Sequence, residues 1–113
     1  MVLCDRVRIM SVWGDLMRER TITREIMTEI RRMNGYAVKQ HGSIYSTAGV
    51  PDILACVAGR FVAVEVKSPT APKAKREPTK AQNHNLQTIA ESGGIAMCVT
   101  SLNQFKSALK AAL

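Results

Sequence analysis

The sequence predicts an α/β fold of the restriction-endonuclease-like kind, a small mixed β-sheet flanked by helices. Apolar residues recur at helical spacing between residues 19 and 33. Three strand-like runs follow, then a second helical segment, another apolar strand and a last helix. At 113 residues, 46% of them apolar, the chain has the size and composition of one domain. We therefore predict a single domain over residues 1–113, in which residues 1–17 are the least readable segment.

The first helix is predicted from apolar positions three and four residues apart, and Asn34-Gly35 closes the pattern as a C-terminal cap. These positions are Ile22, Ile26, Met27, Ile30 and Met33.

Three strands are predicted next: YAVKQH, then PDILACVA and RFVAVEVK around Ala58-Gly59. The last two read as an antiparallel hairpin. The following segment, SPTAPKAKREP, contains three prolines, so we expect neither strand nor helix there but a mobile basic loop.

A second helix is predicted from Thr79 to about Glu91 and is ended by Ser92-Gly93-Gly94. The run IAMCVT supplies another strand, and Ser101 caps a last helix that continues to Leu113.

Charge and composition restrict the class of partner. The formal net charge of +7 favours an anionic partner, with nucleic acid first and an acidic membrane surface second. No uncharged run approaches the roughly 20 residues that span a bilayer, and the N-terminus has no continuous apolar core of a signal peptide. Three cysteines without a C-x-x-C pair indicate free thiols in a reducing cytoplasm, and no ligand spacing supports zinc.

Charged residues interrupt the hairpin where a buried strand has no use for them. Glu65 and Lys67 are two residues apart and so point to the same face of their strand. The turn at Ala58-Gly59 brings Asp52, at the start of the partner strand, close to both. Two neighbouring carboxylates repel unless a cation lies between them, and hard oxygen ligands suit Mg²⁺ or Mn²⁺. Such a metal would polarise a phosphodiester and lower the pKa of a bound water, while Lys67 orients that water. The alternative is an exposed ion pair on an edge strand.

These residues resemble a known family. Pro51-Asp52, a twelve-residue spacer and Glu65-Val66-Lys67 have the form of the PD-(D/E)XK nuclease signature. The phrases GVPDILA, GRFVAVEVKSP, PTKAQ and ESGGIAMCV resemble those of its VRR-NUC branch, the virus-type replication-repair nucleases, from about Glu19 to Leu109.

The resemblance implies a Mg²⁺- or Mn²⁺-dependent DNA endonuclease without an organic cofactor, similar to Holliday-junction resolvases that act on branched DNA as homodimers. Asp52 and Glu65 would be direct metal ligands, with the Val66 carbonyl as a third and Glu19 acting through a water. The alternatives are a nuclease for flaps, nicks or plain duplex, and a DNA-binding module of the same fold without activity.

Two further site residues follow from the resemblance. The family's helical glutamate aligns with Glu19, which also falls near the centre of the apolar stripe of the first helix. The alternative is an acidic residue in a frayed first turn. The family's glutamine aligns with Gln82, which contacts the nucleophile or the substrate phosphate in this reading. Thr79 and Gln82 can equally form a T-x-x-Q capping box.

Several residues are predicted to contact DNA. A basic cluster beside the site reads as a DNA clamp or as a solvated charged loop: Lys73, Lys75, Arg76 and Lys80. Ser46 and Thr47, just ahead of Asp52, could contact phosphate or be ordinary turn residues. His41 is a further candidate for a general base.

Overall fold

The computed structural model describes residues 2–41 and 47–113; of residues 2–11 it describes the backbone alone. The elements follow in the order α1 (Val2–Arg32), β1 (Tyr36–Lys39), β2 (Ile53–Val57), β3 (Arg60–Val66), α2 (Lys73–Arg76), α3 (Lys80–Glu91), β4 (Ile95–Val99) and α4 (Leu102–Ala112). The predicted α/β class is confirmed.

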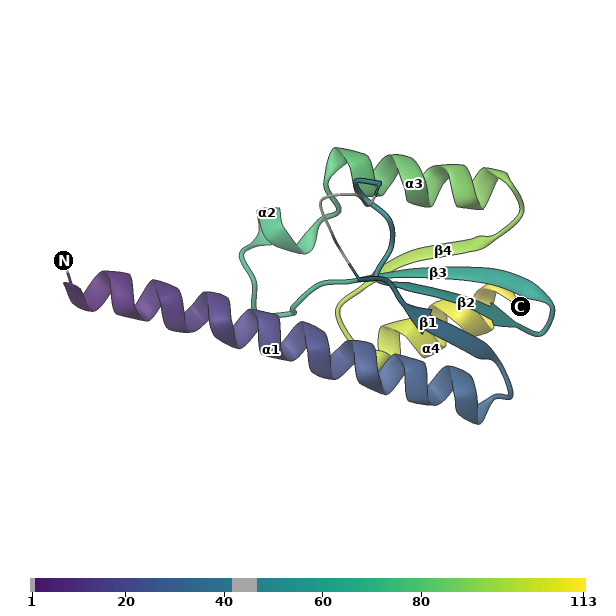
Figure 1. The fold of residues 1–113 in the computed structure, drawn as a ribbon, viewed down its shortest axis with the longest axis horizontal. Coiled ribbons are helices and arrows are strands. Elements are labelled where there is room, and N and C mark those ends of the chain that lie inside the picture. The colour runs from purple at the N-terminus through teal and green to yellow at the C-terminus, as the bar shows by residue number, and fades with distance from the viewer. Residues whose placement is uncertain (1, 42–46) are drawn as a thin grey trace.

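The four strands form one mixed sheet in the order β1-β2-β3-β4. The pairs β1–β2 and β2–β3 are antiparallel, whereas β3 and β4 are parallel. Helix α3, which connects the parallel pair, lies against one face, and α1 and α4 lie against the other (Figure 1). Of the two inner strands, β3 is thus covered on both faces from Val62 to Val66, whereas β2 contacts α1 alone and leaves Cys56 exposed.

The predicted hairpin is confirmed, with β2 and β3 joined by Ala58-Gly59. Both turn residues have positive φ, 51° and 78°, as a two-residue turn between twisted strands requires. The turn sets the register in which Val57 pairs with Arg60 and Ile53 with Val64. That register determines which residues meet at the open end of the hairpin.

The core lies between the sheet and the pair α1 and α4. The stripe predicted on α1 supplies its buried isoleucines, and Phe105 and Leu109 of α4 pack beside them. The fully enclosed side chains at its centre are Ile26, Ile30, Ile53, Val62, Val64 and Phe105.

Helix α1 is longer than predicted, because it begins at Val2 instead of near Glu19. Its 31 residues correspond to about 46 Å of helix, and the N-terminal part extends beyond the sheet (Figure 1). Val12 and Trp13, on that part, are 56% and 60% exposed. The apolar pattern is weak there because no sheet lies opposite it.

The prediction that residues 68–78 contain no helix is wrong at Lys73–Arg76, which form the one-turn helix α2. Pro72 stands immediately before the turn, where a proline removes no helical hydrogen bond, and its carbonyl accepts from the backbone N–H groups of Lys75 and Arg76. Within the described residues, none of the helices has both the length and the apolar character needed to cross a bilayer.

Candidate active site

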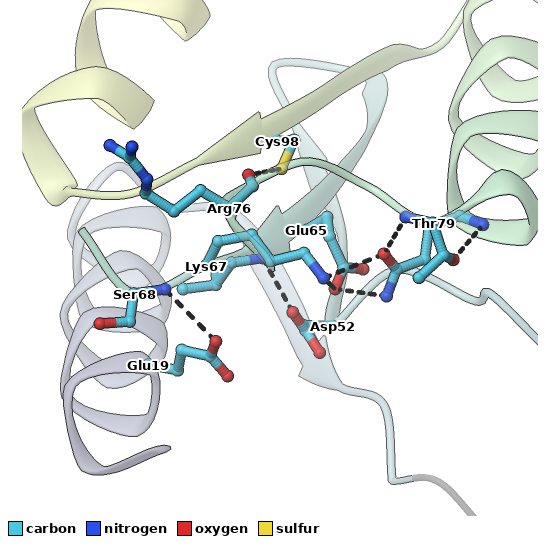
Figure 2. A network of polar contacts seen from close by, with 10 residues as sticks. Glu19, Asp52, Glu65, Lys67, Ser68, Arg76, Thr79 and Cys98 are labelled. Atoms are coloured by element: carbon cyan, nitrogen blue, oxygen red, sulfur yellow. Dashed lines mark hydrogen bonds and ion pairs between the residues drawn. The ribbon is translucent and has the colours of Figure 1, made fainter. Parts of the chain in front are cut away.

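Asp52 and Glu65 lie opposite each other at the open end of the hairpin. Asp52 directly precedes β2, and the pairing of Ile53 with Val64 places it across from Glu65. One oxygen of Asp52, Oδ2, accepts a hydrogen bond from the backbone N–H of Val66 at 2.8 Å. The hairpin register thus brings together the two carboxylates singled out in the sequence (Figure 2).

Glu65 is a buried carboxyl group, with 3% of the residue exposed. Its Oε1 accepts a hydrogen bond from Gln82 Nε2 at 3.1 Å, but its buried Oε2 has no hydrogen-bond partner among the described residues. Burial, and next the negative charge of Asp52, raise the pKa of Glu65 to about 8. The alternative of an exposed edge-strand ion pair is therefore wrong, because β3 is an inner strand and Glu65 is enclosed.

Lys67 reaches the same point from the end of β3. Its Nζ donates a hydrogen bond to Gln82 Oε1 at 3.0 Å and lies 3.8 Å from Glu65 Oε1. The side chain of Lys67 is only 13% exposed. The spacing of Glu65 and Lys67 thus places an acid and a base side by side, as expected for one face of a strand.

Gln82 forms the predicted capping box and also contacts two of the candidate site residues. Its Oε1 accepts from the backbone N–H of Thr79 at 2.8 Å, and its own N–H donates to Thr79 Oγ1 at 3.2 Å, which completes the capping box at the start of α3. The same side chain contacts Glu65 and Lys67. The helix cap therefore fixes an amide that bridges the two charged groups.

Glu19 approaches from α1. It lies more than four turns into the helix, so the alternative of a frayed first turn is wrong. Its Oε1 accepts a hydrogen bond from the backbone N–H of Ser68, just past β3, at 3.3 Å. Burial raises the pKa of Glu19, and that hydrogen bond partly opposes the effect. Glu19 therefore joins α1 to the strand that carries Glu65 and Lys67 (Figure 2).

Sequence reasoning missed a polar cluster behind Glu19. Asp15, one helical turn earlier, accepts hydrogen bonds from Ser68 Oγ at 2.9 Å and Thr70 Oγ1 at 2.6 Å. The hydrogen bond from Thr70 has the largest effect on the pKa of Asp15 and lowers it, and the bond from Ser68 lowers it further. Helical spacing could have revealed the cluster, because Asp15 and Glu19 are four residues apart and share a face.

A hollow of about 620 Å³ adjoins these residues between α1 and residues 71–79, and Glu19, Lys67 and Lys75 are among the residues that line it. The predicted basic cluster is exposed beside it: Lys73, Lys75, Arg76 and Lys80. Thr47 and His41 are exposed, and Ser46 lies outside the described residues.

The donor set at the hairpin end fits a hard divalent cation. Two carboxylates face each other, and Glu65 Oε2 is a buried acceptor without a partner among the described residues. The N–H and C=O of a strand residue leave the strand on the same side, so the Val66 carbonyl is directed, like its N–H, toward Asp52. In the described part of the chain, no group of three or more His, Cys, Asp or Glu side chains is arranged to hold a metal ion. Side chains alone would therefore supply two ligands.

The fold of this α/β domain is similar to that of a solved structure, and a second solved structure aligns with a smaller part of the chain. One, described as a VRR_NUC domain, aligns with a TM-score of 0.66 and 20% identity over 82% of this chain and 95% of that chain. The other is a 1.6 Å resolution structure of Hjc, a Holliday junction resolvase from Archaeoglobus fulgidus, with a TM-score of 0.47 and 22% identity over 67% of this chain and 61% of that chain.

The predicted resemblance to VRR-NUC domains is confirmed for the fold. Neither a family model nor a curated protein sequence matches the chain. The roles of individual residues therefore rest on the geometry of the site.

Proposed function

We propose that the protein is a Mg²⁺- or Mn²⁺-dependent endonuclease that hydrolyses phosphodiester bonds in DNA. The observation that carries this proposal is the buried Glu65 carboxyl, which faces Asp52 and presents an oxygen without a partner among the described residues. A protein that had no use for the charge would be more stable with an apolar residue there. The VRR-NUC fold supports the same reaction class.

We assign one set of residues to binding the cation and another to positioning the reacting groups. Asp52, Glu65 and the Val66 carbonyl would hold the metal, with Glu19 reaching it through a water. When bound, the cation neutralises charge on the scissile phosphate and makes a water molecule more acidic.

Lys67 is the positioning cation of the reaction. Its ammonium group has three donors, and Gln82 Oε1 takes one of them. The other donors are available for the attacking water or a phosphate oxygen. Gln82 sets the direction of the lysine because the start of α3 fixes it from behind.

The exposed cations around the 620 Å³ hollow, Lys73, Lys75, Arg76 and Lys80, supply phosphate contacts beside the site. We also assign phosphate contacts to Thr47, which is exposed, and to Ser46, which lies outside the described residues. The free thiols of Cys56 and Cys98 suit a reducing cytoplasm as the place of action.

We propose branched DNA as the preferred substrate and a homodimer as the acting species. One chain carries one set of Asp52, Glu65 and Lys67 and can cut one strand. A four-way junction needs two cuts related by approximate two-fold symmetry, which a two-fold dimer provides.

The test is cleavage of labelled four-way junctions, flaps, nicked duplex and linear duplex with Mg²⁺, Mn²⁺, Ca²⁺ or excess chelator. We expect cutting with Mg²⁺ or Mn²⁺, best on junctions, and none in chelator. Lys67→Ala should retain metal and DNA binding and lose most of the rate, whereas Lys110→Ala, at an exposed position of α4, should cut like the wild type.

Full activity in chelator would refute the metal role. Binding without cutting of any substrate would leave a DNA-binding module, and preference for flaps or nicks would replace the junction assignment.

A further inference from the structure

A second basic surface lies farther along α1, between this helix and β1. A hollow of about 300 Å³ there is lined by Arg20, Thr23, Arg24, Met27, Arg31 and Lys39. Four of these six residues are cations and none is acidic. The surface, called the α1–β1 groove below, is separate from the basic cluster of α2.

The arginines of α1 whose side chains the structure describes lie on two flanks of the helix. At 100° per residue, Arg20, Arg24 and Arg31 fall within about 40° of one another around the helix. The arginines toward the other flank have acidic neighbours. Arg32 Nε donates to Glu29 Oε2 at 3.0 Å, and Arg18 Nη1 lies 4.0 Å from Asp15 Oδ1.

The groove cations have no such partners. Within the described residues, none of Arg20, Arg24, Arg31 and Lys39 forms an ion pair or a side-chain hydrogen bond. Arg31 lies in the last turn, where the helix dipole favours a cation. That reason does not extend to Arg20 and Arg24, which are four residues apart and repel each other in the free protein.

The groove begins at the candidate active site. Arg20 directly follows Glu19 on α1. On the opposite wall, Lys39 directly precedes Gln40, whose backbone N–H donates to the Asp52 carbonyl at 2.7 Å. A chain of phosphates lying in the groove would therefore lead toward the carboxylates.

We propose that the α1–β1 groove binds the phosphate backbone of a DNA duplex arm that runs into the active site. This inference rests on the proposed function and names the path of its substrate. Arg20 to Arg31 spans about 16 Å of helix, a length comparable to about five base-pair steps of 3.4 Å along a duplex axis. Guanidinium groups match phosphate oxygens in geometry as well as in charge. The start of the groove beside the carboxylates of the candidate nuclease site favours DNA over an acidic protein surface.

The test compares two double variants of equal charge, Arg20→Gln/Arg24→Gln in the groove and Arg18→Gln/Arg32→Gln outside it. Binding to a fluorescein-labelled four-way junction is followed by anisotropy in chelator across a series of salt concentrations. We expect the groove variant to reduce the slope of log affinity against log salt by about 0.9 for each phosphate that the protein no longer neutralises. The control should keep the wild-type slope, and circular dichroism should show the same helix content in both.

Lys39→Gln provides an independent test from the other wall, with an expected reduction of about 0.9, should the groove double variant fail to fold. A wild-type slope in the folded groove variant, or equal reductions in the groove and control variants, would overturn the inference. Weaker binding to anionic vesicles with unchanged DNA binding would overturn it as well.

Cleavage by the wild-type protein decides the proposed function separately. If the wild type cuts and the groove variant keeps its slope, only the groove assignment fails. If the wild type binds without cutting and the slope still falls, the groove assignment stands and the nuclease proposal fails.

Discussion

At the scale of single residues, the ionised form of Glu65 is electrostatically unfavourable in the candidate site. The carboxyl group is buried, faces a second carboxylate, and leaves Oε2 without a partner among the described residues. Lys67, at 3.8 Å, and Gln82 offset only part of that cost through Oε1. A bound cation would satisfy the remaining oxygen, so ligand binding and stability should be linked at this residue.

The raised pKa of Glu65 predicts a pH dependence of the metal-free protein. The carboxyl binds its proton more tightly when folded, at a pKa of about 8 against 4.5 for the unconstrained group. Its contribution to the free energy of unfolding is therefore complete below about pH 4.5 and is lost as the pH rises through about 8. Urea unfolding in chelator between pH 5 and 9 measures this loss. Glu65→Gln should flatten the profile, and identical profiles for the two proteins would contradict the assignment.

Two glutamates of α1 allow a matched test of the site. Glu19 is half-buried and bonded to Ser68, whereas Glu25 is exposed. We expect Glu19→Gln to reduce cleavage by at least tenfold without loss of folding, because a neutral amide holds a metal-bound water less well. Glu25→Gln should cut at the wild-type rate. The reverse result in initial-rate measurements would show that the wrong face of α1 was assigned to the site.

At the scale of elements, the start of α3 determines the position of Gln82. The capping box fixes the side chain, and the loop before β2 presses against the same turn: Asn85 Nδ2 donates to the Ala48 carbonyl at 3.0 Å. Gly49 makes this approach possible, because a Cβ there would lie 2.5 Å from the Ala81 carbonyl carbon. The loop that leads to Asp52 and the helix that carries Gln82 are thus in direct contact.

A pair of glycines separates the effect of this contact from backbone strain. Gly49 and Gly59 share a φ of +78°, but a Cβ on Gly59 would meet nothing within 4 Å. Gly59→Ala should cost about 1–2 kcal/mol from the left-handed conformation alone and leave cleavage unchanged. Gly49→Ala should cost more and also reduce cleavage, since it displaces the Thr79–Gln82 turn. Denaturant unfolding and initial rates distinguish the two, and equal effects would contradict the proposed role of the contact.

At the scale of the whole molecule, local patterns predicted most of the fold. The stripe of Ile22, Ile26 and Ile30, the Ala58-Gly59 turn and the Ser101 cap each act within a few residues, so the sequence reveals them. The N-terminal half of α1 was not predicted, because it packs against no sheet and its apolar pattern is weak. Helix α2 was not predicted, because a single turn is too short to show a helical period.

The candidate site was likewise predictable where local structure brings its residues together, and not where distant segments meet. Asp52, Glu65 and Lys67 could be brought together from the hairpin register alone. Helical spacing places Asp15 on the face of Glu19, but its partners Ser68 and Thr70 are far away in the chain, so they follow only from the docking of α1 beside the end of β3.

Assembly is a prediction at this scale. Val12, Trp13, Leu16 and Met17 form an exposed apolar surface on the projecting part of α1. We expect the protein to sediment as a dimer, alone and with an immobile four-way junction, because pairing would remove this surface from water. Trp13→Glu should yield monomers, whereas Tyr36→Glu, at an exposed aromatic position on β1, should not. A wild-type protein that stays monomeric in both conditions would refute the dimer.

The parallel pairing of β3 with β4 has a consequence for how the protein is made. During synthesis α1 and the three antiparallel strands β1, β2 and β3 emerge first, with β3 still at the edge of the sheet. Helix α3, with Gln82, and then β4 must follow before β3 becomes an inner strand. A chain that ends before α3 and β4 would therefore leave Glu65 on an edge strand, without the enclosure that it has in the candidate site of the full fold.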